Sequence, residues 1–436
     1  MLTKLFQTIE KITPVKWRWI FNHEGFRRYF ANTGWMFLGQ AFGLLMSFLV
    51  GAWVIRYLGP ERYGIFSYAL AFAGLFSFLA SLGVDNILQR ELVNTPEKRD
   101  QLMGTALVMK LVGGGIAFIV TVGTIFLIDS SNLVRFLVLI QALALIIQAF
   151  GVISLFFQAQ VQAKKNIQSQ IMAGLISSAL KVILILNGLG VIWLMLIYVL
   201  DSVWISLFLF RAYQRSGLKV RAWRFKLPLA KQIFRSSWLL ALTNASMLVY
   251  MKIDQVMIGQ IIDKQAVGLY ASTVRVFELT YVAPAIIAGS LFPAILNARK
   301  TDLQSYHNRL RSMGKLLAII SILIALATTL LAKYIIIILF GADYSAAIIT
   351  LQIGAWSIVG MALTYLVNQY LIAEDKIKFY FIITLIGAIV NIGLNYYLIP
   401  HYGINGAAIA TIIAYLVVPG VGMTYFNLNR KKHEKQ

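Results

Sequence analysis

The chain has 436 residues, of which 59% are hydrophobic and only 13% are charged. A soluble protein of this length cannot bury so much apolar surface, so the composition indicates an integral membrane protein. The sequence has no cysteine, which excludes disulfides and thiolate metal sites, and its four histidines lack the spacing of metal ligands. We therefore expect no metal site and no cofactor.

The first 30 residues precede any long apolar segment. In residues 1–30, Lys and Arg alternate with Leu, Ile, Phe and Trp. This pattern predicts an amphipathic helix on an anionic leaflet; a solvated basic tail is the alternative.

Twelve apolar segments of about 20 residues follow in chain order, each the length of a transmembrane helix. Short turns containing Gly, Pro, Asn or Asp, such as DSSN at 129–132, join several of them, so neighbouring helices must be antiparallel. The predicted spans are 33–55, 65–84, 103–128, 133–155, 167–187, 190–211, 237–259, 267–295, 314–339, 345–372, 379–399 and 405–427.

The positive charge is distributed unevenly between the two sides of the predicted membrane protein. With the N-terminus in the cytoplasm, most of the 39 Lys and Arg residues fall in the cytoplasmic loops and both tails. The positive-inside rule therefore predicts that both termini are cytoplasmic. The net charge of +22 then reflects contact with anionic membrane lipids, and we expect no nucleic-acid partner. The opposite side holds only Arg56, Arg62, Arg135, Lys264 and Lys333.

A basic stretch at 212–236 divides the chain into two halves of six spans each, 31–211 and 237–427, and a basic tail follows at 428–436. The halves are weakly similar: RYLGPERYGIFSYA at 56–69 aligns with QIIDKQAVGLYAST at 260–273. Because six is even, both halves enter the membrane from the same side. This arrangement predicts a parallel repeat with a substrate site between the halves.

The longer segments RYLGPERYGIFSYALAF and KIDQVMIGQIIDKQAVGLYASTVRVFE resemble the signature of polysaccharide-transporter flippases. These lipid-linked oligosaccharide flippases belong to the exporter superfamily that also holds the multidrug and toxin extrusion proteins and the lipid II flippase. The resemblance implies an all-α membrane protein with twelve helices in two six-helix lobes that form a V. It also implies a central cavity that opens alternately to each side, and cargo carried on an isoprenoid diphosphate. A bacterial inner-membrane location follows, with the polysaccharide polymerase and chain-length machinery as candidate partners.

We expect seven charged residues of the predicted spans to lie at membrane depth, where a charge is costly unless it faces protein or water. Lys252 and Asp254 are two residues apart, and side chains at this spacing point roughly 200° apart on a helix, so they cannot pair locally. Asp254 instead shares a stripe with Tyr250. The seven are Lys110, Lys181, Asp201, Lys252, Asp254, Arg275 and Glu278.

A diphosphate needs cations in a cavity of low dielectric constant, and a sugar chain needs polar and aromatic walls. We expect one carboxylate, Asp254, Glu278 or Asp201, to couple transport to a proton or sodium gradient. Structural roles remain open: Arg275 and Glu278 can neutralise each other, and Asp201 can pair with a lysine. Lys110 can extend to the membrane surface. The residues that we expect to bind diphosphate and sugar are Lys110, Lys181, Lys252, Arg275, Tyr250 and Asn244.

The sequence has no nucleotide-binding G-x-x-x-x-G-K-[S/T] motif and no acidic motif in an outer loop, so we expect a transporter and not an enzyme. The predicted function is a flippase for an undecaprenyl-diphosphate-linked oligosaccharide in O-antigen, capsule or exopolysaccharide synthesis. The alternatives are a multidrug-type cation antiporter, which would favour acids over bases in its cavity, and a membrane enzyme of polysaccharide assembly.

Overall fold

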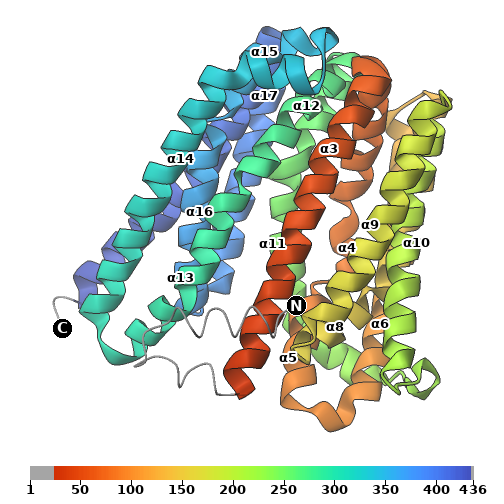
Figure 1. The fold of residues 1–436 in the computed structure, drawn as a ribbon. Helices are drawn as coiled ribbons and strands as arrows, with labels where there is room; N and C mark the ends of the chain where they lie inside the picture. The colour runs from red at the N-terminus through yellow and green to blue at the C-terminus, as the bar shows by residue number, and fades with distance from the viewer. Residues whose placement is uncertain (1–23, 434–436) are drawn as a thin grey trace, which may run out of the picture.

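The computed structural model describes residues 24–433, and this range contains helices and no strands (Figure 1). The all-α fold class is therefore confirmed. Most of the predicted amphipathic segment, residues 1–23, and the last three residues of the basic tail lie outside the described range. The proposed membrane-surface helix stays a prediction.

Helix α3 (Glu24–Leu75) contains both the first and the second predicted span. Its two arms meet at Gly59, whose φ of 70° is a conformation that glycine adopts without steric cost. Pro60 follows, and proline suits the first turn of a helix because the amide that it lacks would have no helical partner there. Figure 1 shows the ribbon of α3 reaching one end of the molecule and turning back toward α4 (Ser77–Ser81).

Four helical stretches of the first half, at 96–128, 132–159, 163–186 and 191–215, cover predicted spans three to six, and the helix at 84–94 lies outside every predicted span but for its first residue. Ser131 begins one of them, because its side chain accepts a hydrogen bond from the amide of Val134. These elements are α5 (Val84–Asn94), η2 (Pro96–Lys98), α6 (Arg99–Ile128), α7 (Asn132–Ile147), η3 (Gln148–Gly151), α8 (Val152–Ala159), α9 (Ala163–Leu186), α10 (Val191–Arg215) and η4 (Val220–Ala222).

The second half begins with a long helix that ends near Asp263. The Asp263 carboxylate accepts a hydrogen bond from the amide of Ala266 and so starts the next helix. Near the C-terminus, Gly403 has a φ of 60° and joins two helical arms, as Gly59 does in α3. The elements are α11 (Leu227–Ile261), α12 (Lys264–Thr280), α13 (Val282–Thr301), α14 (Leu303–Leu339), η5 (Ala342–Ala347), α15 (Ile348–Gly354), α16 (Ser357–Ala373) and α17 (Ile377–His433).

Eight helical stretches of the described chain are long and apolar enough to cross a membrane, or nine if α15 and α16 form one bent span. Two of the eight contain the breaks at Gly59 and Gly403, where pairs of predicted spans meet. Helix α11, which holds the predicted seventh span, is not among them. The membrane-protein class is confirmed, and the number twelve stays a prediction.

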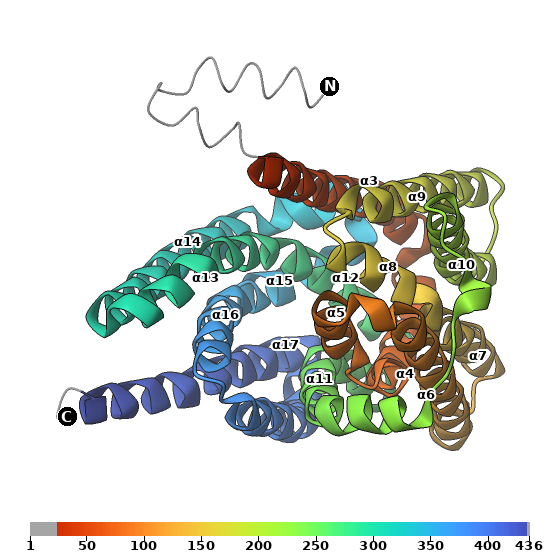
Figure 2. The ribbon, with the colours of Figure 1, turned by 90° about the horizontal axis from the view of Figure 1, so that it is seen from below.

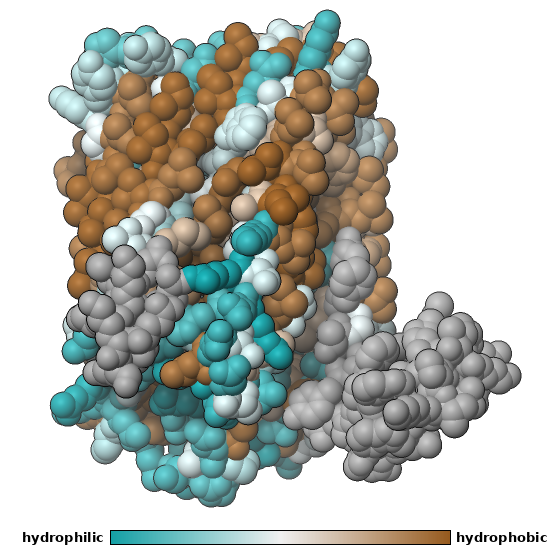
Figure 3. All heavy atoms as spheres, turned by 90° about the vertical axis from the view of Figure 1, so that its left-hand side faces the viewer, coloured by the Kyte–Doolittle hydropathy of each residue, from teal (hydrophilic) through white to brown (hydrophobic). Residues whose placement is uncertain are grey.

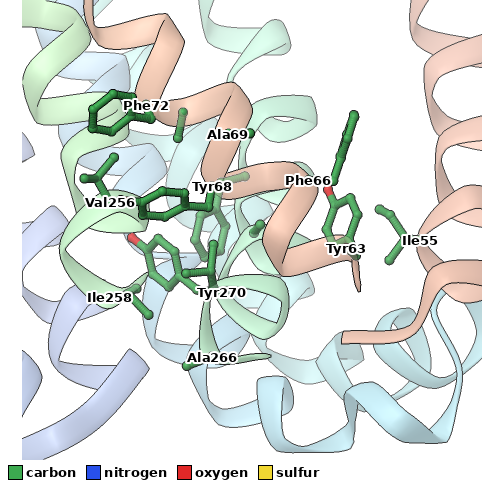
Figure 4. Packing of buried hydrophobic residues seen from close by; sticks show 14 of the residues in the cluster. Ile55, Tyr63, Phe66, Tyr68, Ala69, Phe72, Val256, Ile258, Ala266 and Tyr270 are labelled. Atoms are coloured by element: carbon green, nitrogen blue, oxygen red, sulfur yellow. The ribbon is translucent and has the colours of Figure 1, made fainter. Parts of the chain in front are cut away.

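The helices form a V in which α12 packs along α3 and α11 packs along α17. Seen from below, α13, α14, α16 and the end of α17 lie on one side and α5 to α10 on the other (Figure 2). Buried side chains of α3, α11 and α12 form part of a core where the halves meet, and Tyr68 of α3 lies beside Val256 and Tyr270 of the second half (Figure 4). The exact limits of the two lobes stay a prediction.

The outer surface of the protein carries many exposed apolar side chains, including Leu127, Leu330 and Ile338, which are 88%, 70% and 68% exposed. On the side drawn in Figure 3, hydrophobic residues form a broad band beneath a hydrophilic top edge, and hydrophilic residues gather below the band. This lower end also carries both ends of the described chain in Figure 1. We call it the basic end, because the 212–236 segment lies there as well.

Candidate functional site

A cavity of about 470 Å³ lies between the two halves of the chain. Helices α3, α9 and α10 line it from the first half, and α11 and α12 line it from the second. Five of the nine predicted site residues therefore come together in one space. The charged residues of its lining are Lys181, Asp201, Lys252, Arg275 and Glu278.

Two cations share one carboxylate on the α11–α12 side of this cavity. The Nζ atom of Lys252 lies 2.8 Å from Oε1 of Glu278, and Nη1 of Arg275 lies 3.5 Å from Oε2 of the same residue. The expectation that Arg275 and Glu278 can neutralise each other is therefore confirmed, but Lys252 competes for that carboxylate. The trio carries a net positive charge toward the cavity.

The α9–α10 side of the cavity contributes one cation and one carboxylate that do not pair with each other. Lys181 Nζ lies over the ring of Tyr198, 4.4 Å from its centroid. Asp201 accepts a hydrogen bond of 2.5 Å from the hydroxyl of Ser177. Among the side chains that the structure describes, neither Lys181 nor Asp201 has an ion-pair partner. The cavity thus holds three cations and two carboxylates.

Lys110 lies outside this cavity, between α5 and α6. Its Nζ atom is 2.7 Å from Oδ1 of Asp85, and its side chain is only 8% exposed. The side chain therefore neither lines the cavity nor extends to the surface of the protein. An ion pair within the first half accounts for this charge, and a part in cargo binding has no support from its position.

Tyr250 and Asn244 also lie outside the cavity lining. Tyr250 is buried in the second half, where its ring packs edge-on against Tyr415 with centroids 5.3 Å apart. Asn244 is exposed on α11. Their predicted contact with sugar is thus not supported by this conformation.

Asp254 is buried on the opposite side of α11 from Lys252, so the prediction that the two do not pair is confirmed. Its Oδ2 accepts hydrogen bonds from the hydroxyls of Tyr270 at 2.8 Å and Thr411 at 2.6 Å. Its Oδ1 accepts one of 2.6 Å from the amide of Asn395. In the described range no cation contacts this carboxylate, so α11, α12 and α17 surround it with neutral donors only.

Two polar atoms of the asparagines beside Asp254 have no hydrogen-bond partner among the described residues: Asn391 Nδ2 and Asn395 Oδ1. Burial of such atoms is costly, so this cluster has capacity for a small bound species. Sequence reasoning did not identify Asn395, Thr411 or Tyr270 as partners of Asp254. The signal that could have found them is the pair of asparagines four residues apart inside an apolar span.

The two halves are also joined by polar contacts at the end of the molecule opposite the basic end. Lys264 Nζ lies 2.8 Å from Oδ2 of Asp129, and the amide of Gln260 donates to the hydroxyl of Tyr68 at 2.6 Å. The hydroxyl of Tyr344 donates to the backbone carbonyl of Ile55 at 2.9 Å. These contacts hold α3 and the α6–α7 turn against the second half.

Two family models match overlapping parts of the chain. Residues 29–299 match the family model described as polysaccharide biosynthesis protein, and residues 202–436 match the model described as lipid II flippase MurJ. Together the two matches extend over nearly all of the described chain.

Two curated proteins with similar sequences carry related names. The probable flippase AglR of Haloferax volcanii is 29% identical over 244 residues, which is 55% of this chain and 50% of AglR. The match therefore covers about half the length of AglR. A putative O-antigen transporter of Shigella flexneri is 20% identical over 87% of this chain and 93% of its own length. These relatives are named as a flippase and a transporter, not as enzymes.

Solved structures show the same fold at low sequence identity. An inward-facing transporter of the multidrug resistance MATE family aligns with a TM-score of 0.73 at 17% identity, covering 91% of this chain and 96% of that one. The lipid II flippase MurJ in an inward closed conformation aligns with a TM-score of 0.68 at 15% identity, covering 91% and 87%. The predicted V-shaped fold, like that of the multidrug and toxin extrusion proteins, is thus confirmed.

Proposed function

Because the chain belongs to the family of polysaccharide biosynthesis proteins, we propose that it is a flippase for a lipid-linked oligosaccharide. Translocation occurs by alternating access, in which the cavity between the halves opens first to one side of the membrane and then to the other. The names of the relatives support this class of cargo.

The charge of the cavity carries the proposal. Lys181, Lys252 and Arg275 line a space of about 470 Å³ together with only two carboxylates, those of Asp201 and Glu278. A net positive cavity suits a diphosphate, because charge-assisted hydrogen bonds to phosphate strengthen where water is excluded. The cargo is then an oligosaccharide on an isoprenoid diphosphate such as the undecaprenyl form, whose tail stays in the bilayer while the head group crosses.

Lys181 is the first of these cations to meet the cargo. Glu278 already neutralises part of the charge of Lys252 and Arg275, whereas Lys181 lies over the face of an aromatic ring and has no ion-pair partner among the described side chains. An incoming diphosphate replaces a weak partner at Lys181. At Lys252 and Arg275 it must compete with a carboxylate.

The basic end faces the cytoplasm of a bacterial cell, in accord with the positive-inside rule, and the protein lies in the inner membrane. Contacts such as Lys264–Asp129 hold the opposite end together, so the conformation corresponds to a cavity accessible from the cytoplasm. In support, the alignment with the inward-facing MATE transporter has a higher TM-score, 0.73, than that with the outward-facing one, 0.62.

Asp254 couples transport to an ion gradient. A carboxylate is costly to bury as an anion among neutral groups, so a proton or a monovalent cation stabilises it. Oxygen atoms of Asp254, Thr411 and the two asparagines of α17 would hold a sodium ion; a proton needs the carboxylate alone. Coupling arises when this binding differs between the two conformations of the transporter.

The test is transport by the purified protein in proteoliposomes. We expect it to move a fluorescent oligosaccharide diphosphate lipid between leaflets, as detected by protection from a membrane-impermeant quencher, and to leave a cationic dye in place. Uptake of the dye without lipid translocation would contradict the flippase and favour a cation antiporter. Empty vesicles and the Lys181→Ala variant serve as controls.

A further inference from the structure

A second pocket, of about 450 Å³, lies between α9 and α10 at the basic end of the first half. Figure 2 shows both helices at the outer edge of the first half, on the far side from α16 and α17. Residues of α9 that line this pocket differ from those that line the central cavity. The pocket is therefore separate from the proposed transport path.

The α9 wall of the pocket presents a cation above an apolar surface. Lys165, Ser169 and Met172 follow at one-turn spacing, so they form one stripe along the helix. Among the side chains that the structure describes, Lys165 has no ion-pair partner; its Nζ donates a hydrogen bond of 2.8 Å to the hydroxyl of Ser216 and lies 5.4 Å from the ring centroid of Phe157. These contacts fix the ammonium group at the mouth of the pocket.

The α10 wall has the same pattern. Phe208, Arg211 and Arg215 lie on one stripe, with the apolar residue deeper and the two cations toward the end of the helix. Like charges four residues apart repel each other, and in the described chain neither arginine forms an ion pair. No acidic residue lines the pocket. An anion between the two helices would relieve this repulsion.

We propose that the α9–α10 pocket binds one anionic glycerophospholipid, with its phosphate held by Lys165, Arg211 and Arg215. The guanidinium groups offer bidentate hydrogen bonds to phosphate oxygens, and Met172 and Phe208 receive the first part of an acyl chain. The charges lie at the ends of two apolar helices, which is the depth of the head groups in a bilayer. A bound lipid would join α9 to α10 on the side away from the cavity.

The test uses the full-length protein in mild detergent, with bound phosphatidylglycerol counted by native mass spectrometry. We expect Arg211→Gln/Arg215→Gln to bind the last retained phosphatidylglycerol at least tenfold more weakly than wild type. The matched control is Lys231→Gln/Arg235→Gln, which removes the same charge at the same spacing from exposed positions of α11 outside the pocket. It should retain wild-type binding.

Three outcomes would overturn the proposal. Equal binding by wild type and the arginine variant would show that the pocket holds no phosphate. Equal retention of phosphatidylcholine, which is zwitterionic, would show that apolar contact alone governs binding. Complete displacement of phosphatidylglycerol by an isoprenoid diphosphate at equal concentration would assign the pocket to the cargo lipid instead. Melting temperatures of both variants, measured without added lipid, exclude misfolding as the cause.

Discussion

Gly64 and Gly268 occupy equivalent positions in the two halves of the chain, and each makes room for the backbone of the other half. A Cβ atom on Gly64 would overlap the carbonyl oxygen of Lys264, and one on Gly268 would overlap that of Pro60. Pro60 and Lys264 are themselves equivalent in the repeat. The short similarity between RYLGPERYGIFSYA and QIIDKQAVGLYAST therefore marks a reciprocal contact between α3 and α12, where only glycine permits so close an approach.

Substitution at this contact should weaken the closed end of the protein. In Gly64→Ala the added methyl group meets backbone atoms that cannot rotate away, and such overpacking costs about 1–3 kcal/mol. We expect a lower melting temperature and reduced transport. Gly74→Ala is the matched control, because it lies in the same helix and its Cβ would meet nothing within 4 Å. Equal effects of the two substitutions would show that the contact does not matter.

A covalent link across the closed end should stop the transport cycle. Asp129 and Lys264 form an ion pair between the halves, and the chain has no cysteine, so Asp129→Cys/Lys264→Cys provides two thiols for one defined cross-link by a bismaleimide with a reducible spacer. We expect the cross-linker to block lipid translocation and reduction of its spacer to restore it. The single-cysteine variants should be insensitive to the cross-linker. Full transport by the cross-linked protein would show that this end need not open.

Maleimide labelling at two exposed positions tests the orientation of the protein in the membrane. We expect membrane-impermeant maleimide to label Ser130→Cys in intact cells, because residue 130 lies at the end opposite the basic end. Lys219→Cys, in the basic segment, should react only after the membrane is permeabilised. The reverse pattern would contradict the cytoplasmic location of both termini.

Asp254→Asn should uncouple transport from its driving ion. The substitution removes the charge, and the side-chain amide of Asn395 can turn its unpartnered oxygen toward the new NH2 group, so we expect the fold to persist. Lipid translocation should then no longer respond to an imposed pH or sodium gradient. Asp201→Asn, in the cavity, should keep the response. If Asp254→Asn retains wild-type gradient dependence, Asp254 is structural, and Glu278 or Asp201 becomes the candidate.

The fold class could be predicted from the sequence because a bilayer imposes a simple rule: long apolar segments must be helical. The same rule could not count the spans, since α3 and α17 each continue through a turn at a glycine with positive φ. Spacing on one helix correctly separated Lys252 from Asp254. It identified which residues share a side of α11, but not which helix each side faces.

The sequence could not show which side chains of the site contact one another. Lys110 and Lys181 look alike as lysines within apolar spans, yet one is buried against Asp85 and the other lines the cavity. The difference depends on how helices distant in sequence pack together. Asn395 and Thr411 likewise join Asp254 only because α17 lies along α11.

The most direct test of the flippase proposal is the affinity of the purified protein for an oligosaccharide diphosphate lipid, compared between Lys181→Gln and wild type. A hydrogen bond to a charged group contributes about 1.5–3 kcal/mol, so we expect binding to weaken roughly tenfold to a hundredfold. Lys333→Gln, which removes an equal charge from an exposed position outside the cavity, should bind as wild type does. Unchanged affinity in Lys181→Gln would contradict the proposal that the cavity between the halves holds the diphosphate.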